Sequence, residues 1–247
     1  RRDSLADVGP ATLDSTPEIG AIGRIPGAIV SPGSTFASIA RRPTWIAPLL
    51  LWTIVSVVVT ATIIPRIDWE RATRQALEKR HQSIPEDRIP AAVEQSRKVG
   101  SVISWIFGFA APALASLFIA VVFWGAFKAF GWDMTFPQSL GATTHAFLPN
   151  VLGALLLIPI LMKRETLDPQ GISDLLRSNL GFLVERDSAK VVHAILQAID
   201  VFSIWSMVLL IIGFAAAAKI SKKAAAGLVV GLWFVWVLIR AGWAAIF

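Results

Sequence analysis

The sequence predicts an all-α protein of the polytopic membrane class, a bundle of about five transmembrane helices. Of its 247 residues, 55% are hydrophobic and 16% are charged, whereas soluble domains carry about 25% charged residues. The apolar residues also gather in five stretches without a formal charge, and a helix needs roughly 20 such residues to cross the hydrocarbon core. Lipid is therefore the expected surroundings of most of the chain.

The chain opens with a polar segment, residues 1–28, that is rich in Pro, Gly, Ser and Asp and has no apolar period. We expect a flexible arm there. In the segment Pro32–Arg42, Ser34 can cap a helix, and Phe36 and Ile39 fall on one helical face. This pattern predicts an interfacial helix against lipid headgroups; an ordinary loop turn is the alternative.

A membrane domain is expected over residues 29–247, with spans at about 45–64, 102–127, 138–161, 195–219 and 224–246. Pro149 predicts a kink in the third span, and the fourth helix is expected to begin near His193. Gly227 and Gly231 in the fifth span form a small-xxx-small pair, which permits close contact between helices.

The connections alternate in length, which predicts tight hairpins on one side of the membrane and longer excursions on the other. The long connection Arg66–Lys98 contains an amphipathic pattern at Trp69–His81, and Lys163–Lys190 contains a helical pattern at Ile172–Leu183. Seven basic residues lie on the short-turn side and thirteen on the long-connection side, which favours cytoplasmic long connections. An odd number of spans places the two ends of the domain on opposite faces.

Two charges interrupt the last two spans, Asp200 and Arg240, and charges in such places are costly. Measured along their helices from the shared turn at Lys219–Lys223, they lie roughly 30 Å and 26 Å away. They are therefore nearly level, and we expect them to pair directly or through water. A structural clamp between the two helices is one interpretation, and a proton or ion relay is the other.

Two further polar residues lie in the third span. Because Pro149 has no N–H, the carbonyl of His145 loses its usual helical donor. A neighbouring helix or a water must then donate a hydrogen bond to that carbonyl. We expect His145 and Asn150 to form hydrogen bonds between helices. The alternative is that His145 ligates a haem or chlorin; no second His lies at a matching depth, since His193 is near a helix start and His81 is in a loop.

Several classes of function lack support in the sequence. There is no cysteine, which excludes disulfides, thiolate catalysis and thiolate metal sites. The chain has no HExxH, GxSxG, GxGxxG or phosphate-loop motif. Its net charge of +6 comes from short basic groups between apolar runs, a pattern typical of headgroup contact rather than nucleic-acid binding. We expect no enzyme activity, cofactor, metal or nucleic-acid partner.

Two long stretches resemble a known family. SPGSTFASIARRPTWIAPLLLWTIV (Ser31–Val55) is similar to the opening of bacterial Yip-domain membrane proteins, relatives of the eukaryotic Ypt/Rab-interacting family. AIDVFSIWSMVLLIIGFAAAAKISKKAAAGLVVGLWFVWVLI (Ala198–Ile239) is similar to the closing two spans of that family. The resemblance implies five spans in a bacterial inner membrane, with the N-terminal arm cytoplasmic and the C-terminus on the far side. This conflicts with the plain count of basic residues, and we follow the family.

The family's members are not known as enzymes. Its eukaryotic relatives act in vesicle trafficking with small GTPases, and some bacterial members resemble a companion subunit of an ABC exporter. The resemblance therefore favours a non-catalytic accessory or scaffold subunit, with the lipid bilayer and other integral membrane subunits as partners. A subunit of a respiratory or photosynthetic complex and a small-solute transporter or channel are the alternatives. Purification in mild detergent with identification of partners discriminates among the three.

Overall fold

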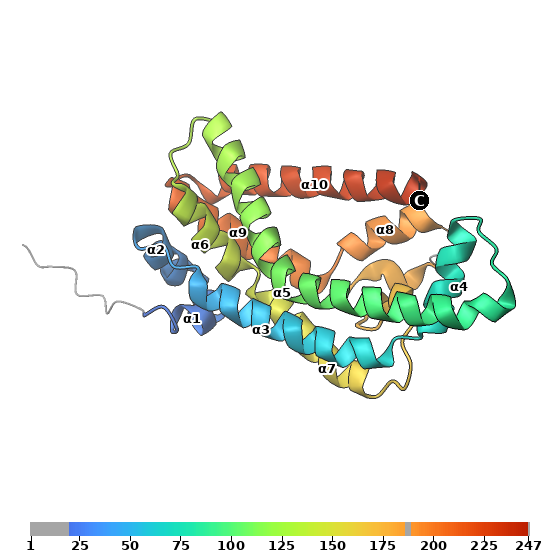
Figure 1. Cartoon of the computed structure of the whole chain (residues 1–247). Coiled ribbons are helices and arrows are strands. Elements are labelled where there is room, and N and C mark those ends of the chain that lie inside the picture. The colour runs from blue at the N-terminus through green and yellow to red at the C-terminus, as the bar shows by residue number, and fades with distance from the viewer. Residues whose placement is uncertain (1–19, 186–188, 247) are drawn as a thin grey trace, which may run out of the picture.

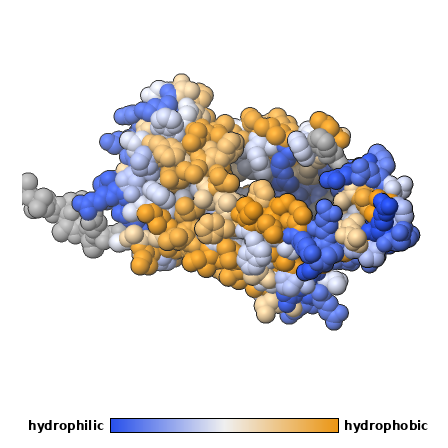
Figure 2. Space-filling model, viewed as in Figure 1, coloured by the Kyte–Doolittle hydropathy of each residue, from blue (hydrophilic) through white to orange (hydrophobic). Residues whose placement is uncertain are grey.

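The computed structural model describes residues 20–185 and 189–246, and over these ranges the chain forms ten α-helices with two isolated β-bridges. Hydrophobic residues cover the middle of the molecule in Figure 2, and hydrophilic residues gather at its two ends. Five helical segments are long and apolar enough to cross a membrane: Ile46–Arg66, Glu86–Ala129, Phe136–Met162, Val201–Ala218 and Lys222–Ile246. The predicted fold class is confirmed.

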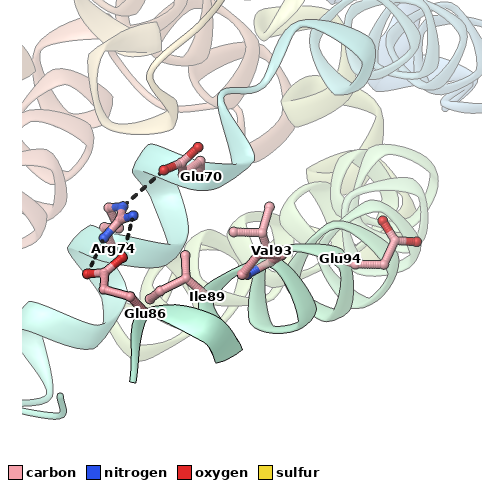
Figure 3. Close-up of a pocket in the computed structure, with 7 residues that line it drawn as sticks. Glu70, Arg74, Glu86, Ile89, Val93 and Glu94 are labelled. Carbon is pink, nitrogen blue, oxygen red and sulfur yellow. Dashed lines mark hydrogen bonds and ion pairs between the residues drawn. The ribbon is translucent and has the colours of Figure 1, made fainter. Parts of the chain in front are cut away.

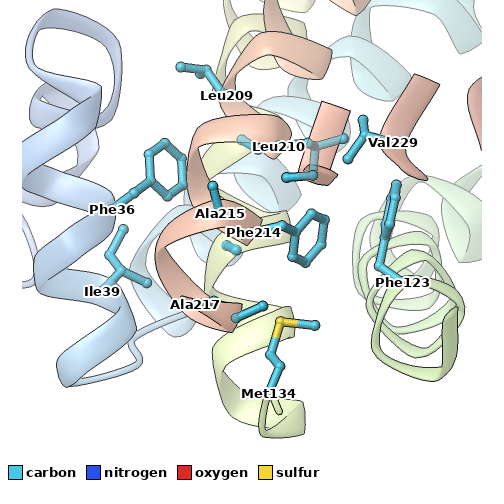
Figure 4. Close-up of a cluster of buried hydrophobic side chains, with 14 of the residues drawn as sticks. Phe36, Ile39, Phe123, Met134, Leu209, Leu210, Phe214, Ala215, Ala217 and Val229 are labelled. Carbon is cyan, nitrogen blue, oxygen red and sulfur yellow. The ribbon is translucent and has the colours of Figure 1, made fainter. Parts of the chain in front are cut away.

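Helix α9 (Val201–Ala218) is the centre of the bundle. It contacts α2 (Pro32–Arg41), α6 (Phe136–Ala146), α7 (Leu148–Met162) and α10 (Lys222–Ile246). Its side chain Phe214 is fully buried, and the centroid of its ring lies 4.6 Å from that of Phe123 and 5.0 Å from that of Phe127. Figure 4 shows Phe214 facing Phe123 of α5 (Ile89–Ala129), with Val229 of α10 above them. Aromatic rings therefore join α9 to α5 at this level, and Val229 of α10 belongs to the same buried apolar cluster.

The N-terminal helices pack against this centre. Helix α1 (Arg24–Val30) begins inside the segment predicted as a flexible arm, so that prediction is wrong for residues 24–28. Residues 1–19 of the predicted arm lie outside the described ranges. Helix α2 (Pro32–Arg41) forms where a helix was expected. Its residues Phe36 and Ile39 are each 1% exposed. The prediction that this face meets headgroups is wrong, because it packs on α9.

Helix α5 (Ile89–Ala129) is much longer than the predicted span. Its 41 residues extend about 60 Å, twice the roughly 30 Å of a hydrocarbon core. Figure 1 shows that it runs beside α3 (Ile46–Ile63) and then bends away from it. Pro112 lies inside the helix and removes a backbone donor there, which accounts for the bend.

The third and fourth spans are each interrupted. Helices α6 (Phe136–Ala146) and α7 (Leu148–Met162) meet at Phe147, beside the predicted kink. Helix α8 (Lys190–Ala198) ends before α9 begins, so the prediction of one continuous fourth helix from residue 195 is wrong. The reason is Asp200, which has extended backbone angles and caps α9 as its first turn forms.

The two faces of the bundle differ. One, the α2 face, carries α1, α2 and the turns near residues 130–135 and 219–221. The other, the α4 face, carries α4 (Trp69–Lys79), α8, residues 163–185 of the second long connection and the end of α10 (Lys222–Ile246) (Figure 1). The predicted amphipathic helix is α4. The predicted helix at 172–183 is wrong, because short 3-10 turns, Pro169–Asp174 and Leu180–Leu183, form there instead.

Candidate functional site

The four intramembrane polar residues that the sequence singled out lie in three places. His145 is in the packed core, Asn150 and Asp200 border the contact between α7 and α9, and Arg240 lies against α8. The structure therefore does not bring them together as one site.

Asp200 joins the start of α9 to the preceding connection. Its Oδ1 accepts a hydrogen bond from the backbone N–H of Ser203 at 2.9 Å, and its Oδ2 accepts one from the Ser178 hydroxyl at 2.5 Å. The Val201 N–H also donates to the Ser178 carbonyl at 3.0 Å. The carboxylate is thus held in place by polar groups on both sides.

Arg240 has different partners. Its Nη2 donates to Oε1 of Gln197 at 3.0 Å, and its guanidinium lies 5.0 Å from the centroid of the Trp236 ring. Among the described residues Asp200 and Arg240 form no direct ion pair, so the predicted direct pair is wrong. The helical rise places Asp200 and Arg240 at similar depths along their helices. The chain breaks at Ile199, however, so α8 runs along α10 and its residue Gln197 contacts Arg240.

The contact with Gln197 extends into a polar network that the sequence analysis missed. Gln197 Nε2 donates to Asp174 Oδ1 at 2.7 Å, and His193 Nε2 lies 3.6 Å from the same oxygen. His193 and Gln197 are four residues apart on α8, so they share one face. The spacing of His193 and Gln197 could have indicated this polar network. It was overlooked because the residues of α8 were assigned to the fourth span.

Asn150 forms a hydrogen bond between helices, as expected: its Nδ2 donates to the Ser206 hydroxyl of α9 at 2.8 Å. His145 does not. Its Nδ1 lies 2.9 Å from the Gly141 carbonyl of its own helix, and its Nε2 is buried without a hydrogen-bond partner among the described residues. Because His145 is fully buried and its Nε2 is enclosed, the metal of a haem or chlorin cannot approach that nitrogen, so the residues do not fit such a group.

A pocket of about 250 Å³ lies between α7, the start of α9 and the 172–179 segment. One part of its lining is polar: Asn150, Ser173, Ser178, Asn179 and Asp200. The rest is apolar: Gly153, Ala154, Leu157, Ile172, Leu176 and Phe202. Asp200 is the only formal charge among these described lining residues. The pocket therefore has one wall that carries the negative charge of Asp200 and several hydrogen-bond acceptors, and another wall that is apolar.

A second pocket, of about 450 Å³, lies between α4 and the first turns of α5. Figure 3 shows Arg74 between Glu70 and Glu86, with Ile89 and Val93 along α5 beside them. Arg74 Nε lies 3.1 Å from Glu70, and its two terminal nitrogens each lie 3.3 Å from an oxygen of Glu86. The hydrogen bonds to Glu86 first, and to Glu70 second, raise the pKa of Arg74 above its ordinary value.

Backbone and side-chain bonds fasten this α4 region to the second long connection. The Asp68 N–H donates to the Leu167 carbonyl at 3.0 Å, the Leu167 N–H donates to the Arg66 carbonyl at 2.6 Å, and Arg71 Nη2 lies 3.2 Å from Asp168. A Cβ at Gly100 would lie 2.5 Å from the Trp69 ring. Glycine at that position lets α4 lie directly on α5.

A family of membrane proteins matches this chain over most of its length. The sequence model of the Yip1 domain matches residues 27–244. Among curated proteins, the chain is similar to "Membrane protein YknW" of Bacillus subtilis (strain 168), with 26% identity over 203 residues, which cover 80% of each chain. No solved structure matches the chain significantly.

Proposed function

The chain belongs to the Yip1 domain family, and on that basis we propose that it acts without catalysis, as an accessory subunit of a larger membrane assembly. An ABC exporter is the assembly that the resemblance of some bacterial members favours. We place the protein in the bacterial inner membrane with its α4 face outside the cytoplasm, as the family resemblance implies.

The observation that carries this proposal is the α4 platform, which we define as α4 together with residues 86–100, which form the 3-10 turn η2 (Glu86–Arg88) and the start of α5. A Cβ at Gly108 of α5 would lie 2.4 Å from the Thr60 side chain near the end of α3. The part of α5 before about residue 104 therefore continues past the end of that neighbouring span. A helix that only crossed the membrane would not need this extension.

The platform presents a groove suited to a protein partner. Its floor is apolar, from Ile89, Pro90 and Val93, and its rim carries three glutamates, Glu70, Glu86 and Glu94, against the single Arg74. Beside the lining, Arg97 and Lys98 pair with Glu94, as Arg74 pairs with Glu70 and Glu86, so the charges of the rim are balanced. An apolar floor within a rim of paired charges favours a partner segment with apolar side chains at its centre and polar groups around them. The platform is also fastened to its neighbours, so little ordering is required when a partner binds.

Site-specific photocrosslinking in cells tests the proposal. A crosslinker at Val93 is expected to join the chain to one discrete protein, identified by mass spectrometry. A crosslinker at Phe118, which is 70% exposed on the span, serves as the lipid-facing control. Glu94→Lys is expected to reduce the Val93 adduct, and Glu78→Lys, on α4 but outside the groove, should leave it unchanged.

Other outcomes would change the interpretation. Absence of a protein adduct at Val93, together with purification of a homogeneous lone chain in mild detergent, contradicts an accessory role and favours a transporter or channel. Recovery of respiratory or photosynthetic subunits as the crosslinked partner supports that alternative assembly instead.

A further inference from the structure

We propose that the pocket between α7 and α9 binds the primary ammonium headgroup of a membrane lipid, with Asp200 as its counter-charge. This site lies apart from the α4 platform, and the inference does not depend on the accessory role.

The depth of the pocket matches a headgroup. Helix α9 has 18 residues between Asp200 and the turn at the opposite face, or about 27 Å, so Asp200 lies close to the edge of a hydrocarbon core of roughly 30 Å. The α7 wall lies at the same level, because a Cβ at Gly153 would be 2.9 Å from the Phe202 ring. The polar wall is therefore at the membrane interface.

The pocket borders the exposed side of α7. Ala154 and Leu157 line it and are half-buried, and the next residues on α7, Leu155 and Leu156, are 43% and 54% exposed. A volume of about 250 Å³ accommodates a short headgroup, since it equals roughly eight water volumes. The acyl chains would remain outside, along the exposed side of α7.

The chemistry of the polar wall selects a cationic donor. Each oxygen of Asp200 accepts one hydrogen bond, and a carboxylate has about four acceptor sites in total, so further acceptor capacity remains. The oxygens of Asn150, Ser173 and Ser178 are additional acceptors in the same lining. A primary ammonium supplies three N–H donors and a positive charge, whereas a quaternary choline group supplies no N–H.

The test uses the full chain in detergent micelles with an equimolar mixture of phosphatidylethanolamine, phosphatidylcholine and phosphatidylglycerol, and native mass spectrometry to count retained lipids. We expect wild type to retain phosphatidylethanolamine about tenfold over the other two, as one charge-assisted hydrogen-bonded contact allows. Asp200→Asn is expected to abolish this preference. Asparagine remains a good helix cap, so α9 should still form.

Two further variants separate binding from folding. Asp133→Asn removes a carboxylate on the opposite face and should keep the preference. Ala154→Trp fills the lipid-facing mouth without removing a charge and should lose it. Equal retention of phosphatidylethanolamine by wild type and Asp200→Asn overturns the proposal. Thermal stabilisation of wild type by soluble ethanolamine alone, without retention of the lipid, keeps the ammonium site and overturns a lipid as its source.

Discussion

The core around α9 and the α4 platform are held together by different forces. Around Phe214 the contacts are apolar, with rings and small residues packed closely and fully buried. In the platform, ion pairs at Arg71 and Arg74 and backbone hydrogen bonds at Leu167 fasten exposed segments to one another. Because of this difference, we expect substitutions in the core to change the stability of the bundle. Substitutions in the platform are expected to change the binding of a partner.

The strongest way to break the core is to overfill it. A Cβ at Gly213 would lie 2.9 Å from the Phe36 ring and 3.2 Å from Ala142, so Gly213→Leu should separate α2 and α6 from α9. We expect a loss of about 1–3 kcal/mol, measured by thermal unfolding in detergent. Gly231→Leu is the matched control, because nothing lies within 4 Å of its Cβ. Equal destabilisation by both variants would contradict the central position of α9.

A smaller effect is expected from the polar contact within the spans. Asn150→Leu removes the 2.8 Å hydrogen bond to Ser206, and bonds of this kind in membranes contribute about 0.6 kcal/mol on average, up to about 1.7. A double-mutant cycle with Ser206→Ala measures the coupling. Coupling near zero would show that Asn150 is satisfied elsewhere and that α7 is held to α9 by packing alone.

Loss of an ion pair in the platform should change local order only, not the stability of the whole bundle. Arg74→Gln removes the ion pairs to Glu70 and Glu86, and we expect faster proteolysis between residues 80 and 88 with no change in the melting temperature of the bundle. Arg80→Gln, on an exposed residue at the end of the same helix, is the control. A fall in the melting temperature caused by Arg74→Gln alone would mean that the platform and the core unfold together.

The smallest expected effect is on stability at low pH, through Asp133 on the α2 face. The hydrogen bond from Lys128 lowers the pKa of Asp133 below its ordinary value of 3.8. A lowered carboxylate pKa adds stability that is present above the ordinary pKa and is lost as pH falls through the lowered one. Asp133→Asn should therefore slightly flatten the acid end of the stability profile, measured by unfolding at decreasing pH. An unchanged profile would show that the exposed pair contributes nothing.

Sequence alone predicted the spans well because crossing lipid requires long apolar stretches wherever they pack. It predicted the faces of those helices poorly. Phe36 was expected against headgroups although it packs on Gly213. Arg240 was expected to pair with Asp200 directly or through water, and its direct partner is Gln197 instead. In a membrane helix the packed side and the lipid side are both apolar, so composition does not show which way a residue points.

The connections on the α4 face were equally difficult. The apolar residues of 172–183 suggested a helix, but two 3-10 turns form there. Ser178, between the turns, donates a hydrogen bond to Asp200, and the second turn contacts α8. Such segments take their shape from partners distant in sequence, and a local periodic pattern contains no information about those partners. The lining of the α7–α9 pocket was therefore beyond prediction except for Asn150 and Asp200.

Helix α5 remains one helix from Ile89 to Ala129 despite the bend at Pro112. One end carries the groove, and the other holds Phe123 and Phe127 against Phe214. One continuous helix therefore joins the groove to the aromatic contact in the core. We expect a displacement of the groove end of α5 to reach the opposite face of the bundle along this helix, without any ion or solute moving through the protein.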